Sequence, residues 1–165
     1  TATTEIYTLS LHDRSSDLYF KDWHADRRFS TGLLLQKGAH DIDILHWLCG
    51  GYSTRVNGMG GLTVYGQIAD RRHPDTPPET GWRDDNWPPL ANKGLNPVVD
   101  VEDLSSVQMA LENGVYCNYM QCHYAPDGWR NYTIIGDHGR LENFNDYHGH
   151  TVVRELGRAS CRERV

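Results

Sequence analysis

The chain has 165 residues, of which 38% are hydrophobic and 23% charged, and its net charge is −6. This length favours one domain with a hydrophobic core of its own. No apolar run approaches the roughly 18 residues that a transmembrane helix needs, and the N-terminus lacks the basic-then-apolar order of a signal peptide. The basic residues are scattered along the chain, which argues against nucleic-acid binding. We therefore expect neither a membrane nor a nucleic-acid partner.

Both ends of the chain resemble a translated sequencing adapter. Residues 1–13 correspond to the adapter in one reading frame, residues 14–18 to its continuation after a one-base slip, and residues 157–165 to its reverse complement. The alternative is a natural strand at the front and a basic tail at the back. We expect 1–18 to be a non-native leader, 19–155 to be one domain, and 156–165 to be a non-native tail.

A helix is predicted over Gly38–Cys49. Apolar residues recur there at helical spacing, and Gly50-Gly51 is a strong stop signal. We expect the apolar stripe to face a sheet; it comprises Ile44, Leu45, Leu48 and Cys49.

Most of the remaining chain is predicted to form strands. Arg55–Tyr65 has strand character, and Asp103–Leu111 alternates and is joined to Val115–Tyr124 by the hairpin signal Asn113-Gly114. A second hairpin connects Asn131–Ile135 to Arg140–Phe144. Between the first two strands, Gln67–Pro97 holds six of the seven prolines, which indicates a long loop.

This element order predicts an α+β fold: a mainly antiparallel open sheet of about five or six strands, with helices on one face. No Gly-x-Gly-x-x-Gly pattern follows a strand, so we predict no nucleotide-binding site in this chain.

The helix also carries a polar stripe, because Gln36, His40, Asp43 and Trp47 are spaced by steps of four, three and four. A histidine titrates near neutral pH and can take a proton from a hydroxyl group, so His40 is a candidate catalytic base. Asp43, one turn later, could orient its imidazole. The alternative is that His40 and Asp43 only brace the helix against the sheet.

Further candidates for substrate binding lie nearby. Lys37 could contact substrate oxygens, or it could be a solvated charge at the helix start. Trp23, His24 and Arg27 could form a pocket wall, because aromatic and guanidinium groups bind sugars well; packing of the loop against the sheet explains them equally.

The cysteines and the remaining histidines indicate no metal site. The four cysteine spacings fit no zinc pattern, and two histidines near the chain end, His148 and His150, lack a third ligand. We interpret the cysteines as reduced and mostly buried, which is typical of a cytoplasmic protein. They are Cys49, Cys117, Cys122 and Cys161.

Several motifs in order resemble the C-terminal domain of the Gfo/Idh/MocA oxidoreductases, over nearly all of 19–144. They are Ser30–Leu48 with its His-Asp-Ile-Asp sequence, Val101-Glu102-Asp103, Glu112-Asn113-Gly114 and Ile135–Glu142. The resemblance implies a two-domain enzyme whose N-terminal Rossmann domain, absent here, binds NAD or NADP. It also implies substrate contacts on the C-terminal domain and a homo-oligomer formed through its sheet.

The same resemblance bears on the site. Members of the family use a histidine on this helix in proton transfer, and His40 matches it. An aspartate four residues earlier is common; here that residue is Gln36, which cannot take a proton, so a hydrogen-bonding role is expected.

We therefore expect the substrate-binding half of an NAD(P)-dependent dehydrogenase or reductase acting on a sugar, polyol or related cyclic alcohol. This chain alone should be inactive and should bind no cofactor. The alternatives are a non-catalytic oligomerisation or ligand-binding module, and a hydride-assisted glycosidase.

Overall fold

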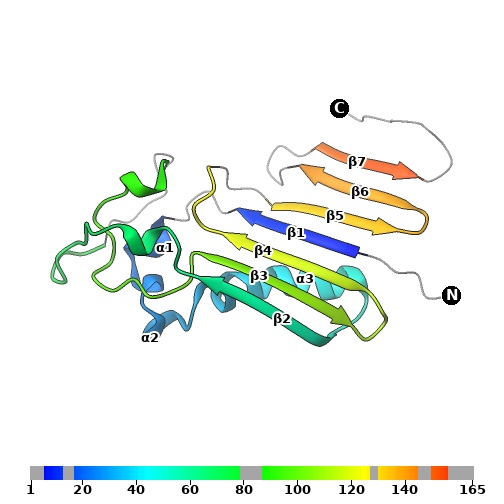
Figure 1. Cartoon of the computed structure of the whole chain (residues 1–165), viewed down its shortest axis with the longest axis horizontal. Coiled ribbons are helices and arrows are strands. Elements are labelled where there is room, and N and C mark those ends of the chain that lie inside the picture. Colours follow the sequence, from blue (N-terminus) through cyan, green and yellow to red (C-terminus); the bar gives the residue numbers. More distant parts are fainter. Residues whose placement is uncertain (1–5, 13–16, 79–86, 127–129, 145–149, 156–165) are drawn as a thin grey trace.

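The computed structural model describes residues 6–12, 17–78, 87–126, 130–144 and 150–155. Within these residues seven strands form one open sheet in the order β2-β3-β4-β1-β5-β6-β7 (Figure 1). The pair β1–β4 is parallel, and every other neighbouring pair is antiparallel. The predicted fold class is confirmed, with more strands than expected. The strands are β1 Ile6–His12, β2 Ser53–Gly61, β3 Leu104–Leu111, β4 Tyr116–Cys122, β5 Arg130–Gly136, β6 Gly139–Phe144 and β7 His150–Glu155.

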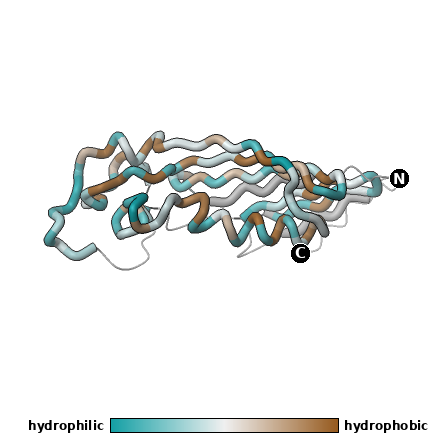
Figure 2. The backbone as a smooth tube through the Cα atoms, turned by 90° about the horizontal axis from the view of Figure 1, so that it is seen from below, coloured by the Kyte–Doolittle hydropathy of each residue, from teal (hydrophilic) through white to brown (hydrophobic). Residues whose placement is uncertain are grey.

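One long helix lies against the sheet, and the remaining helices are short. Figure 2 shows the long helix, α3, on one side of the strands, whereas the short helices gather at one end of the molecule. No helix in the described ranges has the length and apolar character needed to cross a membrane. The α-helices are α1 Leu18–Lys21, α2 Arg27–Ser30 and α3 Ala39–Cys49; the π-helical turn is Leu34–Gly38; the 3-10 turns are Trp23–Ala25, Tyr65–Gln67 and Pro89–Ala91.

The contact between α3 and the sheet forms a core that we call the helix–sheet core. On α3 its buried members are Leu45 and Cys49, four residues apart, as expected for one face of a helix. Half-buried Ile42, Tyr132 and Ile134 pack at its margin. The buried members are Leu45, Cys49, Val107, Met109, Leu111, Val115, Cys117 and Tyr119.

The predicted buried stripe of α3 was half wrong. Leu45 and Cys49 are buried, whereas Ile44 and Leu48 are 37% and 39% exposed. Residues 44/48 and 45/49 recur at the same spacing, so periodicity alone could not choose between them. The rotation of α3 is set instead by Asp41, which is buried on the same side as Leu45 and contacts β4 and β5.

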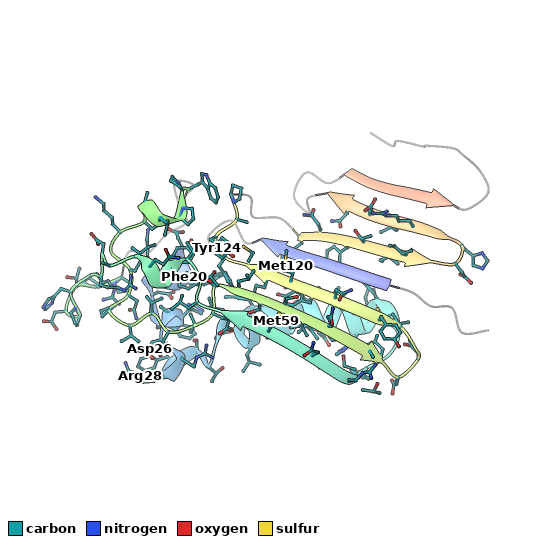
Figure 3. All side chains as sticks on the ribbon, in the orientation of Figure 1. Phe20, Asp26, Arg28, Met59, Met120 and Tyr124 are labelled. Carbon is teal, nitrogen blue, oxygen red and sulfur yellow. The ribbon has the colours of Figure 1, made fainter. Side chains whose placement is uncertain are left out.

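A second core, which we call the loop core, lies at the end of the sheet where the short helices gather. It is built from α1, the loop segments and the strand ends rather than from the middle of the strands. The labelled Phe20 and Tyr124 mark its position in Figure 3. Its buried members are Tyr19, Phe20, Leu33, Tyr65, Ile68, Leu95 and Val101.

A buried carboxylate stabilises the loop core. Asp103 is 0% exposed and accepts hydrogen bonds from the backbone N–H groups of Thr63, Val64 and Tyr65 and from the Thr63 hydroxyl, at 2.7–2.8 Å. These N–H groups follow the end of β2 and have no strand partner. Asp103 therefore supplies the acceptors that irregular backbone needs in an interior.

The opposite face of the sheet is uncovered in the described structure. Met59 on β2, Ser106 on β3 and Met120 on β4 lie in one row of the register, on the face away from α3 (Figure 3). Met59 is 72% and Met120 38% exposed. This face therefore presents apolar side chains to solvent.

Part of the segment assigned to the leader lies in the sheet. β1 pairs with β4 on one side and β5 on the other, with Ile6 opposite both Tyr116 and Ile135. The non-native origin of residues 1–18 stays a prediction, and the tail assigned to 156–165 lies outside the described residues.

Candidate functional site

The segment that leads into α3 is held by one carboxylate. Glu102 Oε1 accepts the Leu34 N–H at 2.6 Å, and Glu102 Oε2 pairs with the Arg27 guanidinium at 2.7 Å. Gly32 has a φ of +138°, and a Cβ there would lie 2.9 Å from both Arg27 Nη1 and Glu102 Oε1. Glycine is therefore required where the chain turns toward α3.

Arg27 is committed to this structural role in the fold. Besides Glu102, its backbone N–H donates to Asp100 Oδ1 at 2.7 Å and its Nη1 donates to the Thr31 carbonyl at 2.9 Å. Its side chain is still 48% exposed. The hydrogen-bond donors of the Arg27 guanidinium are therefore already used by protein groups.

His40 lies in the first turn of α3 and is exposed. The N-terminal end of α3 points toward the end of the molecule that holds α1 and α2 (Figure 1). Asp43 is also exposed, and no hydrogen bond joins it to His40 within the described residues. Gln36 is half-buried, and its backbone N–H donates to the Gly32 carbonyl at 3.1 Å. The imidazole of His40 is therefore accessible but is not oriented by Asp43.

Trp23, His24 and Lys37 are brought together around Tyr19, and we call these four residues the aromatic cluster. The Trp23 and His24 rings stack at 3.7 Å between centroids, and the Tyr19 ring contacts His24 edge-on at 5.2 Å. The Lys37 ammonium lies 4.2 Å from the centre of the Tyr19 ring, within cation–π range. Residues separated in sequence thus meet around the buried Tyr19 ring.

Beneath α3 runs a chain of buried polar side chains that sequence reasoning missed. Asp41 Oδ1 accepts Arg130 Nε at 3.2 Å, and the Tyr119 hydroxyl lies 3.4 Å from Asp41 Oδ2 and 3.0 Å from Gln121 Oε1. The Gln121 amide nitrogen donates to the Leu33 carbonyl at 3.3 Å and contacts His123 Nε2. The signal was present: in the predicted strand Val115–Tyr124, the positions that alternate with Cys117 on its buried side include Gln121 and His123.

This chain of polar groups lies between His40 and the aromatic cluster. Asp41 follows His40 in sequence, and the His123 ring meets the Tyr19 ring edge-on at 5.6 Å. Gly38 sits directly against β4, since a Cβ there would lie 3.0 Å from the Tyr119 ring. The position of His40 is therefore tied to the aromatic cluster through buried contacts with β4.

The pKa values of the two carboxylates that anchor this region, Asp41 and Glu102, are shifted in opposite directions. Burial raises the pKa of Asp41, and the nearby Arg130 offsets this effect only in part. Burial acts on Glu102 in the same sense, but the Leu34 N–H and Arg27 outweigh it, so the pKa of Glu102 is lowered. Burial and the adjacent Asp41 raise the pKa of Tyr119 well above its ordinary value, which keeps the phenol protonated.

The described cysteines are free and buried, as predicted. Cys49 Sγ lies 3.6 Å from Cys117 Sγ in the helix–sheet core, and Cys122 is buried near the end of β4. In the described part of the chain no three His, Cys, Asp or Glu side chains gather as metal ligands do. His148 and the side chain of His150 lie outside the described residues.

Comparison with known proteins identifies the class. The sequence model of the GFO/IDH/MocA C-terminal domain matches residues 3–142, and the chain belongs to this family. "Putative oxidoreductase YteT" of Bacillus subtilis (strain 168) is 26% identical over 168 residues, which cover 79% of this chain and 38% of that protein.

Two solved structures illustrate the shared fold. Levoglucosan dehydrogenase, in complex with NADH and levoglucosan, superposes with a TM-score of 0.62 at 15% identity, over 96% of this chain and 38% of that one. The aldose-aldose oxidoreductase from Caulobacter crescentus, complexed with glycerol, superposes with a TM-score of 0.63 at 16% identity, over 99% and 40%. This chain thus spans about two-fifths of the length of these relatives.

Proposed function

We propose that this chain is the substrate-binding part of an NAD(P)-dependent dehydrogenase or reductase that acts on a sugar, polyol or related cyclic alcohol. Family membership supports the class of reaction. The names of two structural relatives, a levoglucosan dehydrogenase and an aldose-aldose oxidoreductase, support a carbohydrate substrate. The observation that carries the proposal is the exposed His40 on the first turn of α3, at the end of the sheet that holds the aromatic cluster.

The cofactor would be held by a domain outside this chain. The described residues contain no strand–glycine loop–helix unit of the kind that cradles a dinucleotide phosphate. When bound in the whole protein, NAD or NADP would accept the hydride that leaves the substrate carbon.

In this mechanism His40 takes the proton from the substrate hydroxyl as the carbon–hydrogen bond breaks, and returns it in the reverse reaction. The buried contacts of Asp41 hold the first turn of α3 in place. The half-buried Gln36 would donate or accept a hydrogen bond with the substrate but could not relay the proton. Asp43, exposed on the same helix, would contact a more distant hydroxyl.

The test needs the complete gene product. His40→Ala should reduce kcat about 100- to 10,000-fold, the usual contribution of a general base. His138→Ala is the matched control, because His138 is 98% exposed in the β5–β6 hairpin and should leave turnover unchanged. Near-normal turnover of the His40 variant would remove the catalytic role of His40, whereas no turnover of the unsubstituted protein with any sugar or polyol would favour a non-catalytic ligand-binding or oligomerisation module.

We also propose that two copies associate through the uncovered face of the sheet. Met59, Tyr116 and Met120 on this face are 72%, 49% and 38% exposed, and apolar side chains of this kind are typical of a subunit interface. Met120→Lys should convert a dimer into a monomer in sedimentation analysis, whereas His138→Lys should not. A monomeric parent protein would contradict this arrangement.

A further inference from the structure

The imidazole of His24 is held by a carboxylate and by two aromatic rings. Its Nδ1 lies 2.8 and 3.0 Å from the two oxygens of Asp22, and Asp22 Oδ1 also accepts the His24 backbone N–H at 2.9 Å. Trp23 stacks on one side of the ring and Tyr19 packs against it edge-on. The ring therefore has one position and one orientation.

The carboxylate determines which nitrogen carries the proton. Asp22 is an acceptor on both oxygens, so Nδ1 must be the donor and, in the neutral ring, Nε2 is an acceptor. Nε2 makes no hydrogen bond with any described residue. The His24 side chain is 14% exposed, so solvent reaches part of the ring.

Two other members of the aromatic cluster offer groups that a carbohydrate can contact. Trp23 is 48% exposed, so the indole offers apolar surface beside the imidazole. Lys37, which contacts the same tyrosine as His24, offers an ammonium donor. A ring face for C–H groups, one fixed acceptor and one donor are what a hydroxylated sugar ring requires.

We propose that the Asp22–His24 pair is a specificity-determining element: His24 Nε2 accepts a hydrogen bond from a ligand hydroxyl while the exposed part of the Trp23 indole contacts the same sugar. The choice of a sugar as ligand rests on the proposed function, whereas the tautomer of His24 does not. The subsite binds and orients; it takes no part in the proton transfer assigned to His40.

The first measurement is nitrogen-15 NMR of the imidazole rings in this 165-residue chain. Long-range proton–nitrogen spectra at pH 8 should show His24 as the Nδ1–H tautomer, and Asp22→Asn should abolish that preference. An Nε2–H tautomer of His24 in the unsubstituted chain would overturn the proposal.

The second measurement tests the ligand. Methyl glycosides of glucose, galactose, mannose and rhamnose are titrated one by one, and at least one should shift the signals of both His24 and Trp23. Tetrahydropyran, a similar ring without hydroxyl groups, should leave His24 unshifted. His24→Phe keeps an aromatic ring between Trp23 and Tyr19 but removes the acceptor, so binding should weaken about 5- to 10-fold, as expected for one lost hydrogen bond.

The two proposals fail separately. Unshifted His24 and Trp23 signals with all four glycosides would overturn the subsite, even if His40→Ala proved inactive in the complete protein. Shifted signals together with an unsubstituted complete protein that turns over no sugar or polyol would instead overturn the proposed enzyme and leave the subsite in place. Circular dichroism of each variant distinguishes loss of binding from loss of fold, and equal affinity of a folded His24→Phe would also overturn the subsite.

Discussion

The helix–sheet core and the loop core bury similar side chains on very different backbones. In the helix–sheet core, α3, β3 and β4 satisfy their own backbone groups, so burial needs only an apolar stripe and an alternating strand. In the loop core the backbone is irregular, and polar side chains such as Asp103 must supply the missing acceptors. The first core depends on periodicity and the second on single residues.

The candidate site draws on both cores. His40 belongs to α3, which covers the sheet, and Gln36 to the π-helical turn before it. Tyr19, on which Lys37 and His24 pack, is a member of the loop core. The chain of polar groups from Asp41 to His123 lies between them. Changes in either core should therefore be detectable at the site.

The largest expected effect is on the loop core. Asp103→Ala leaves three backbone N–H groups without their acceptor in the interior, which should lower the free energy of unfolding by about 3–5 kcal/mol. Asp70→Ala is the control, because Asp70 is exposed and accepts a single bond from the Gly94 N–H, at 2.7 Å; its loss should be below about 1 kcal/mol. Urea denaturation measures both, and equal losses would contradict the role given to Asp103.

In the helix–sheet core the free energy of unfolding should depend on the size of the buried apolar side chains. Leu45 is 1% exposed and Leu48 39% exposed on the same helix. Leu45→Ala should cost about 2–5 kcal/mol, the usual range for a buried leucine, and Leu48→Ala less than about 1 kcal/mol. A larger loss for Leu48 would show that Leu48 packs against the sheet, as the sequence predicted, and that the orientation of α3 described above is wrong.

The two anchoring carboxylates should show opposite dependence on pH. The pKa of Asp41 is raised on folding, so its contribution is present below its unfolded value, about 3.9, and declines as pH rises through the folded value. The pKa of Glu102 is lowered, so its contribution is present above its unfolded value, about 4.3, and is lost as pH falls through the folded value.

Melting temperatures between about pH 3 and 8 measure this difference. Relative to Asp41→Asn, the unsubstituted chain should lose stability as the pH rises; relative to Glu102→Gln, it should lose stability on acidification. Parallel profiles for the two pairs would show that the surroundings assigned to one carboxylate are wrong.

The smallest effect is expected at the end of the chain. Removal of residues 156–165, the tail that we interpret as non-native, should leave the melting temperature unchanged. A clear decrease would show that the tail contributes to the fold. Sequencing of the source DNA across residues 18/19 and 155/156 would test the non-native origin directly.

The sequence predicted the strands of the helix–sheet core but not the residues of the loop core. Hairpin signals and alternation predicted β3 to β6 to within one or two residues, because β3–β4 and β5–β6 are adjacent in sequence. β2 was predicted as Arg55–Tyr65 but spans Ser53–Gly61. The loop core could not be predicted: Tyr65, Ile68 and Leu95 are buried through contacts with α1, which no periodic pattern encodes. The two strands that were not predicted, β1 and β7, fall in or beside the segments assigned to the chain ends.

The candidate site was predicted in composition but not in arrangement. The sequence indicated Trp23, His24 and Lys37 as candidates, but the stack on His24 depends on Tyr19, which periodicity does not distinguish. The role of Asp22 in orienting the imidazole was also missed, since an aspartate two residues before a histidine has no fixed meaning until the turn between them is known. The pairing of Arg27 with the distant Glu102 was also not visible in the sequence.

β1 has a consequence for how fast this chain folds. β3–β4 and β5–β6 are local hairpins, and a hairpin forms within about 1–10 microseconds. β1 has no near neighbour in sequence: Ile6 must meet Tyr116 on one side and Ile135 on the other. Closing these long loops is entropically costly before any pairing compensates. We expect the docking of β1 to set the folding rate, so the strand that leaves the ribosome first among those described joins the sheet last.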